Sequence, residues 1–570
     1  MLLWERLRLT LPRANLNALT RAKPRAPQCH PPPCFGVYPD QGAHRIAIGA
    51  HIQGETTMRV RHVLMACLLL PTLASAQWKQ ASDATWHPPQ DTELTTVPGV
   101  GDLAPDPVFN GGLGFNRFDF NDNNSDLDRA RSIIQVRCGA GCIRFLVFGM
   151  HQHGSTWDAV VAKIDSSGAL DPTFGNAGKM LIPTPLFYVT DVTVDASALH
   201  FYFSGWKHTG AAPDNDFAVT CADATGAACA GFGTLGTVTK WFDLDTNKDD
   251  KALRIRYRPA VGPNPASLLV GGIARGGTPA APADRVGVFA IDPVTGATLA
   301  SFGNGGKVVM QVGEISDLAS VNLFDMALSP SNVPGGERLY LAGSFQRAPL
   351  ANNDIDGYVM AIDPEDGSLA TSFHGGMVAV HNDIGPPGNP FDEVGGIAVL
   401  PDGKVAMVGR SVDANSKDQL LLARATALDG LDPAFCGGGV CAHLSPDPTA
   451  SVDTYAIGVR PTTHDLVVAT TETRSSGPGQ LERLQVLEQY SASGITLHGR
   501  TEKDYATWNG QTPDATTGGL VVGTNAAGGY AMTVGSALWD TPNNDYDLVV
   551  LRTIATDELF ASGFGIPGIE

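Results

Sequence analysis

From about residue 101 onward, short runs of apolar residues alternate with turns rich in glycine, aspartate and proline. The segment 391–444 contains one full period of this pattern. Two apolar runs, 394–400 and 404–409, flank Pro401-Asp402-Gly403, and an Asp-Gly turn between two such runs is a strong hairpin signal. A polar loop leads to a third run, 419–424, and the turn at Asp429-Gly430 leads to a fourth. One period therefore predicts four short antiparallel strands, which we call a, b, c and d in chain order.

Many of these strands are apolar on both faces. Runs such as 359–361, 420–422 and 548–551 contain no polar position. A strand of this kind must be covered on both sides, as happens when four-stranded sheets pack face to face around an axis. The chain has no long segment with apolar residues at a helical period, and it contains 65 Gly and 39 Pro. The pattern therefore predicts an all-β fold, a β-propeller with four-stranded antiparallel blades.

The number of blades follows from counting first strands. The segments that qualify as strand a are 133–136, 191–194, 253–257, 324–328, 397–400, 455–459 and 520–523. The chain begins with a single strand near 115–120, and its last period stops after strand c. We therefore expect the N-terminal strand to complete the last blade as its strand d, which leaves no open sheet edge. The prediction is one seven-bladed propeller domain over 101–566.

A phrase built on phenylalanine and glycine separates strand c from strand d. Its fullest copies are 169–179, Ala-Leu-Asp-Pro-Thr-Phe-Gly-Asn-Ala-Gly-Lys, and 300–307, Ala-Ser-Phe-Gly-Asn-Gly-Gly-Lys. Together with Leu-Pro-Asp-Gly-Lys-Val at 400–405 and arginine-ended third strands at 418–424 and 547–552, the phrase resembles the delta-60 repeat of secreted bacterial β-propeller proteins. The strand order is similar to that of NHL-type propellers. The resemblance implies an exported propeller with strand a lining the axis, and it implies no catalytic residues.

Residues 58–76 have the features of an export signal. They begin with basic residues, continue with an apolar run and end in Ala74-Ser75-Ala76, the three parts of a secretory signal peptide. We expect cleavage after Ala76 and a secreted or periplasmic mature chain, with 1–57 as a disordered, over-extended start and 77–100 as a linker. A lipoprotein signal ending at Cys67 is the alternative, but the apolar run continues beyond that cysteine.

The net charge limits the possible binding partners, and the spacing of the cysteines predicts how they are bonded. Residues 1–76 contain nine basic and three acidic residues, so the formal net charge of −19 becomes −25 in 77–570. This balance argues against nucleic acid or an anionic membrane as partner, because both need a basic footprint. No run after residue 76 is long and apolar enough for a membrane span. We expect the mature chain to be a monomer. Six cysteines form three close pairs around turns, which we interpret as disulfides, with zinc half-sites as the alternative. The pairs are Cys138/Cys142, Cys221/Cys229 and Cys436/Cys441.

We expect the binding site among the d–a and b–c loops, which share one face of a propeller with this strand order. Two d–a loops are acidic, 119–128 and 243–250. Oxygen ligands at alternate positions of the second loop suit one hard cation, so Ca²⁺ is the candidate cofactor. The candidate ligands are Asp243, Asp245, Asn247 and Asp249. The likeness to an EF-hand is partial, since Lys248 and Arg254 stand where Gly and Glu are wanted, and a solvated acidic turn is the alternative.

Further candidates fall in or near the same loops. His151 and His153 share one side of an extended segment and suggest a transition-metal site, with a plain polar loop as the alternative. Trp206, Trp508 and Trp539 are candidate stacking rings for a sugar, unless they pack against neighbouring loops. Aspartate also recurs before strand c, which favours a structural role because a catalytic residue is needed once. These aspartates are Asp158, Asp216, Asp356, Asp418 and Asp547.

Motifs that would identify an enzyme are missing. The chain has no nucleophile elbow, zinc-protease motif, phosphate-binding loop or haem attachment motif. We therefore predict an exported binding or interaction module with an unknown protein or glycan partner, its site on the acidic loop face, and no catalytic residue assigned. One alternative is a propeller lyase, hydrolase or quinoprotein with an axial site, because propeller active sites are assembled from separated loops. Another is a carbohydrate-binding or structural surface protein. Functional residues are expected in what the repeats do not share.

Overall fold

The computed structural model describes residues 103–555 with gaps, and these residues belong to one compact unit, Ala76–Glu570. The gaps are 121–126, 139–141, 154–155, 187, 210–213, 246–247, 279–280, 313–320, 347–354, 383–390, 414, 448, 478–479, 504, 506–513, 526–527 and 541–544. The predictions for residues 1–57, 58–76 and 77–100 lie outside the described residues.

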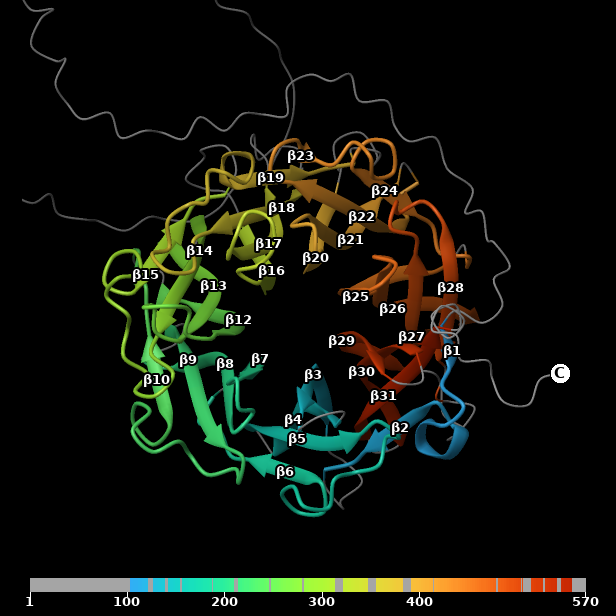
Figure 1. Ribbon diagram of the computed structural model, residues 1–570, viewed down its shortest axis with the longest axis horizontal. Coiled ribbons are helices and arrows are strands. Elements are labelled where there is room, and N and C mark those ends of the chain that lie inside the picture. The colour runs from blue at the N-terminus through green and yellow to red at the C-terminus, as the bar shows by residue number, and fades with distance from the viewer. Residues whose placement is uncertain are drawn as a thin grey trace, which may run out of the picture. The chain divides into compact units, whose positions relative to one another are not determined.

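The described residues form seven antiparallel sheets arranged in a ring (Figure 1). Each sheet is one blade, and in blades 1 to 6 the main strands run in chain order from the axis outward. Blade 1 contains β3 (Asp128–Arg137), β4 (Ile143–His153), β5 (Thr156–Asp165) and β6 (Lys179–Ile182). Blade 2 contains β7 (Tyr188–Val194), β8 (His200–His208), β9 (Asp214–Asp223), β10 (Thr237–Lys240) and the short β11 (Lys248–Asp249). Blade 3 contains β12 (Lys251–Arg258), β13 (Ser267–Thr278), β14 (Ala281–Ile291) and β15 (Lys307–Met310).

The remaining blades repeat this arrangement. Blade 4 contains β16 (Val321–Leu328), β17 (Leu339–Gln346), β18 (Ile355–Ile362) and β19 (Met377–Val380). Blade 5 contains β20 (Asp392–Val399), β21 (Val405–Val412), β22 (Asp418–Thr426), β23 (Gly430–Leu431) and β24 (Val440–His443). Blade 6 contains β25 (Ser451–Val459), β26 (Leu466–Gly477), β27 (Gln480–Tyr490) and β28 (Leu497–Lys503). Blade 7 contains β29 (Ala515–Asn525), β30 (Gly528–Asp540) and β31 (Asp545–Ala555).

The two ends of the domain meet in blade 7. The N-terminal strands β1 (Ala104–Pro105) and β2 (Phe115–Phe118) both pair antiparallel with β31, so β2 is the strand d of the last blade. Short 3₁₀ helices, η1 (Phe109–Gly112) and η3 (His374–Gly376), lie in two copies of the Phe-Gly phrase. The seven predicted first strands correspond to the innermost strands β3, β7, β12, β16, β20, β25 and β29. The predicted fold and its closure are therefore confirmed.

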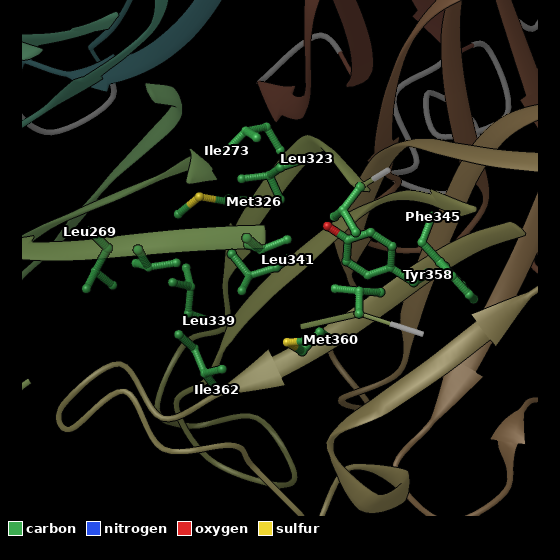
Figure 2. Packing of buried hydrophobic residues seen from close by; sticks show 14 of the residues in the cluster. Leu269, Ile273, Leu323, Met326, Leu339, Leu341, Phe345, Tyr358, Met360 and Ile362 are labelled. Atoms are coloured by element: carbon green, nitrogen blue, oxygen red, sulfur yellow. The ribbon is translucent and has the colours of Figure 1, made fainter. Parts of the chain in front are cut away.

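Neighbouring blades pack face to face and form the core. In β17, Leu339 and Leu341 pack toward blade 3, whereas Tyr340 and Ala342 pack toward blade 5, and all four side chains are buried. Figure 2 shows the first of these interfaces, where Ile273 of β13 in blade 3 lies close to Leu323 of β16 in blade 4. Complete burial of one such side chain contributes roughly 1.5–3 kcal/mol. A strand in the middle of a blade thus buries both faces, which explains the runs with no polar position.

The Phe-Gly phrase joins one blade to the next. At five junctions the residue after the phenylalanine, or after its equivalent, donates its backbone N–H to a carbonyl in the c–d turn of the following blade. The pairs are Asn110–Ser167, Gly233–Thr295, Gly303–Asp366, His374–Ala427 and Cys436–Ser493. A glycine in that turn leaves room for the ring: a Cβ at Gly494 would lie 2.3 Å from Phe435, and its φ of +82° also favours glycine. The repeat therefore stabilises blade contacts on the face opposite the d–a and b–c loops.

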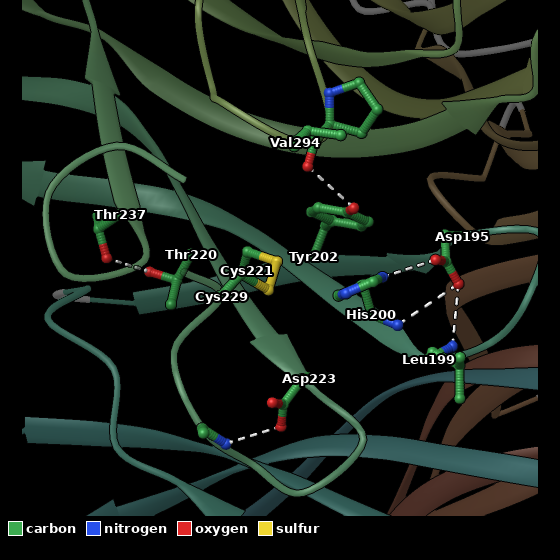
Figure 3. The surroundings of a disulfide bond; sticks show 12 residues. Asp195, Leu199, His200, Tyr202, Thr220, Cys221, Asp223, Cys229, Thr237 and Val294 are labelled. Atoms are coloured by element: carbon green, nitrogen blue, oxygen red, sulfur yellow. Dashed lines mark hydrogen bonds and ion pairs between the residues drawn. A yellow bond between two sulfur atoms is a disulfide. The ribbon is translucent and has the colours of Figure 1, made fainter. Parts of the chain in front are cut away.

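The three predicted cysteine pairs form disulfides, Cys138–Cys142, Cys221–Cys229 and Cys436–Cys441. Figure 3 shows the second, which joins β9 to its following turn beside the hydrogen-bonded pair Thr220–Thr237. Disulfides form and persist in oxidising compartments, so their presence favours an extracellular setting. Among the described residues, none of the helices has the length and apolar character needed to cross a membrane.

Candidate functional site

Two adjoining cavities lie where the innermost strands meet. The larger has a volume of about 510 Å³ and is lined by residues of all seven innermost strands. The smaller, of about 390 Å³, shares Arg131 and Thr517 with it. The smaller cavity is also lined by Arg129 at the start of β3 and by Arg483 and Tyr546 near the starts of β27 and β31. These are the strand ends that border the d–a and b–c loops. The two adjoining cavities, which we together call the axial cavity, therefore reach the face on which we expected the site.

A β-bulge occurs in every innermost strand. One residue of each strand is skipped in the pairing with strand b: Arg131, Thr190, Leu253, Phe324, Gly395, Thr454 and Gly518. A bulge bends its strand and re-aims the side chains beside it. The skipped residue and its successor are both glycine in blades 5 and 7 and differ among the other five blades, so the bulges create a largely non-repeating surface at the axis. This agrees with the expectation that functional residues lie in what the repeats do not share.

Five arginines line the two cavities: Arg129, Arg131, Arg254, Arg256 and Arg483. Only two carboxylates, Asp191 and Asp325, line them among the described residues. The axial cavity is therefore basic, although the chain as a whole carries a formal net charge of −19.

Three of the arginines have carboxylate partners. Arg256 Nη1 lies 2.6 Å from Asp191 Oδ2, and its Nη2 lies 2.9 Å from Asp325 Oδ1. Arg254 lies 3.6 Å from Asp325, and Arg483 lies 2.6 Å from Asp514. The two inner aspartates also bridge blades, since Asp191 accepts the backbone N–H of Ile255 and Asp325 accepts that of Ile397, each at 3.0 Å. These pairs hold neighbouring innermost strands together.

Arg131 and Arg129 have no such partner. Arg131 donates through Nε to the Val189 carbonyl at 3.0 Å and through Nη2 to the Tyr188 hydroxyl, and its guanidinium lies 4.9 Å from the centre of the Tyr188 ring. Arg129 donates to the same hydroxyl at 3.4 Å. Across the described ranges, no carboxylate lies within ion-pair distance of either guanidinium. Burial lowers the pKa of Arg131, Tyr188 partly opposes this, and Arg129 and Arg254 lower the pKa further.

Aromatic side chains fix the position of Tyr188. Its ring stacks on Trp206, with centres 5.1 Å apart, and meets the edge of Trp157 at 5.8 Å. Lys251 lies 5.5 Å from the centre of the Trp206 ring. Trp206 therefore packs against neighbouring residues, which was the alternative to a sugar-stacking role. Trp508 and the side chain of Trp539 lie outside the described residues.

Among the described residues, the aspartates predicted to bind Ca²⁺ have different neighbours. Asp249 pairs with Lys251 and Arg275, and Asp245 accepts the N–H of Gly277 at 2.8 Å. Asn247 lies outside the described residues. Asp243 instead groups with two other aspartates, its ligand atom lying within 4.8 Å of Asp216 and Asp250. The Ca²⁺ hypothesis stays a prediction, now with a different set of neighbours for Asp243.

The other acidic loop contributes to a second group of carboxylates. Oxygens of Asp119, Asp128 and Asp547 lie within 4.8 Å of one another. His151 Nδ1 lies 2.8 Å from Asp128 Oδ1, and both side chains are buried. The predicted transition-metal pair is therefore described only through His151, because the side chain of His153 lies outside the described residues.

The recurring aspartates lie at the starts of third strands, as predicted, and two bond to neighbouring loops. Asp158 accepts the N–H of Thr184 at 3.4 Å, and Asp216 accepts the hydroxyl of Thr209 at 2.7 Å. Burial raises the pKa of Asp216. Asp547 pairs with Arg117 at 2.5 Å, and burial, partly opposed by Arg117, raises the pKa of Asp547 to about 7.

The sequence analysis missed the axial arginines. A signal for them exists, because 128–132 and 251–258 place arginine or lysine at every second or third position of a first strand. First strands of the other blades carry few charges there. Strand a lines the axis in a propeller with this strand order, so basic residues in a strand a predict a basic axis. The strand order alone is enough for this inference.

No family model matches the sequence, and no curated protein matches it. Solved structures that are similar in part include "polysaccharide lyase Uly1", with a TM-score of 0.37 and 10% identity over 72% of this chain and 88% of that chain. The "Dos1 propeller" has a TM-score of 0.36 and 11% identity over 77% of this chain and 95% of that chain. An ulvan lyase of family PL25 has a TM-score of 0.37 and 10% identity over 75% of this chain and 94% of that chain. Similarity at this level carries no activity or substrate over to this chain.

Proposed function

We propose that this protein is an exported β-propeller that binds an anionic ligand at the axial cavity, on the face of the d–a and b–c loops. The observation that carries the proposal is the half-buried guanidinium of Arg131, which has no carboxylate partner among the described residues and lies near Arg129 and Arg254. A cation removed from water without a counter-ion costs free energy. An acidic ligand would supply the missing partner.

Arg256 provides the internal comparison for this proposal. It lies in the same cavity, yet two aspartates neutralise it, and the group has a structural role between blades. Arg131 and Arg129 offer N–H donors in a fixed orientation, because Tyr188, held by Trp206 and Trp157, positions both guanidiniums. Arginine in a fixed orientation is suited to carboxylate or sulfate groups, which it binds through paired hydrogen bonds.

Thermal unfolding of residues 77–570 tests the proposal. Succinate, citrate and sulfate are added at constant ionic strength to the wild type, to Arg131→Met and to Arg474→Met. Arg474 is a suitable control because it lies in blade 6 and pairs with Glu502 outside the cavity. We expect at least one anion to raise the melting temperature of the wild type and of Arg474→Met by several degrees more than that of Arg131→Met.

The ligand-free proteins add a second readout. Arg131→Met should melt no lower than the wild type, because it removes an unpaired half-buried charge. Equal anion shifts in all three proteins would contradict the proposal, since that result would reflect a general salt effect rather than binding at Arg131.

A further inference from the structure

We infer that the anion is a sugar acid, a carboxylate carried on a polyhydroxylated ring. This inference rests on the proposed function and adds the class of ligand. It draws on three properties of the axial cavity: the division of its walls, its hydroxyl groups and its size.

The walls of the larger cavity differ in character. Blades 1 to 4 contribute its charged residues, which are Arg131, Asp191, Arg254, Arg256 and Asp325. Thr517 is the one polar side chain that blades 5 to 7 contribute to the larger cavity. Their other lining residues are small or aliphatic: Ile397, Ala456, Ile457, Gly518, Gly519 and Leu520. A ligand that fills this space needs one charged edge and one apolar face. A sugar acid has both, because the C–H groups of its ring form an apolar face beside the carboxylate.

Hydroxyl groups near Arg131 extend the polar side of the cavity. Ser132 follows Arg131 in β3, and Thr516 lies beside the shared residue Thr517 in β29. Neither hydroxyl has a hydrogen-bond partner within the part of the chain that the structure describes. Each can donate and accept, and so can the hydroxyls of a sugar ring.

The volume points the same way. Ligand pockets for drug-sized molecules measure about 300–1,000 Å³, and the two adjoining cavities of about 390 and 510 Å³ fall in that range. An inorganic anion would use only the part next to the guanidiniums. A ligand of one or two sugar rings would use the apolar wall as well.

Calorimetric titration of residues 77–570 tests the inference. The probes are disaccharides of galacturonate, glucuronate and mannuronate that have no C=C bond in their rings. The methyl ester of each disaccharide is its neutral counterpart, and succinate is a carboxylate without a ring. We expect one uronate disaccharide to bind at least 10-fold more tightly than its ester and than succinate. Arg131→Met should weaken that binding at least 10-fold, whereas Arg474→Met should leave it unchanged.

A cavity-filling variant separates the two levels of the proposal. Ala456→Trp fills the space beside the apolar wall and leaves the guanidiniums in place. It should weaken uronate binding at least 10-fold and leave the affinity for succinate unchanged. Ala456→Leu replaces this variant if the larger side chain prevents folding. If succinate binds as tightly as every uronate in an Arg131-dependent way, the sugar-acid inference is overturned and the proposed function stands. If no uronate binds, the sugar-acid inference is overturned. If citrate and sulfate also fail to bind, or if Arg131→Met binds every anion as the wild type does, the proposed function is overturned as well.

Discussion

At the scale of single residues, the environment decides what an arginine does. Arg256 and Arg131 lie in the same cavity on innermost strands, but Arg256 is neutralised by two aspartates and Arg131 by none among the described residues. The sequence carries basic residues in both segments, 128–132 and 251–258. The sequence does not show which guanidinium is paired, because Asp191 and Asp325 come from the two neighbouring blades and meet Arg256 only when these blades pack together.

Asp547 provides a prediction on pH. Burial raises its pKa to about 7, so the folded chain holds a proton that the unfolded chain releases from about pH 4 upward. Stability should therefore fall as the pH rises from about 4 to about 7. Burial also raises the pKa values of Asp128, Asp216 and Asp250, and these residues act in the same direction.

Urea unfolding at pH 5 and pH 8 measures the effect. We expect the wild type to be more stable at pH 5 than at pH 8, and Asp547→Asn to reduce the difference by about 1–3 kcal/mol, since one pKa unit corresponds to about 1.4 kcal/mol. A variant with the full wild-type dependence on pH would show that the Asp547 carboxyl ionises normally in the fold.

At the scale of elements, most of the structure was predictable because its causes are local. Apolar runs and Asp-Gly turns specify strands and hairpins within a few residues of each other, as in 394–409, which became β20 and β21. The bulges in the innermost strands were not predictable. Each depends on the pairing of strand a with strand b and on the neighbouring blade, and the bulge residues range from Arg131 to Gly518, so no single residue type marks them.

A buried ion pair helps to hold the N-terminal segment against β31. Arg552 of β31 lies 3.1 Å from Asp106, just after β1, and both side chains are almost fully buried. Removing one partner of such a pair leaves the other charge uncompensated, so Asp106→Ala should lower the free energy of unfolding by about 3–5 kcal/mol. The same change at Asp402, an exposed turn residue next to Lys404, should cost less than about 1 kcal/mol. Equal, small effects in chemical unfolding would show that the Asp106–Arg552 ion pair does not stabilise the closure of the ring.

At the scale of the whole molecule, the charge of the chain conceals the chemistry of its axis. The negative net charge argued against an anionic partner, and the acidic loops 119–128 and 243–250 predicted an acidic binding face. The axial cavity within it is basic, because β3 and β12, which are far apart in sequence, bring Arg129, Arg131 and Arg254 close together. The net charge of a sequence does not show that acidic loops and a basic cavity lie on the same face, whereas the folded ring shows it.

A crystal structure of residues 77–570 grown with the anion that stabilises the wild type most is the most direct test of ligand binding at the axis. The account predicts that the acidic group of this ligand lies in the axial cavity, within hydrogen-bond distance of Arg131 and close to Arg129. A ligand bound instead on the outer acidic loops, or on the face that carries the Phe-Gly phrases, with the axial cavity filled by water, would contradict it.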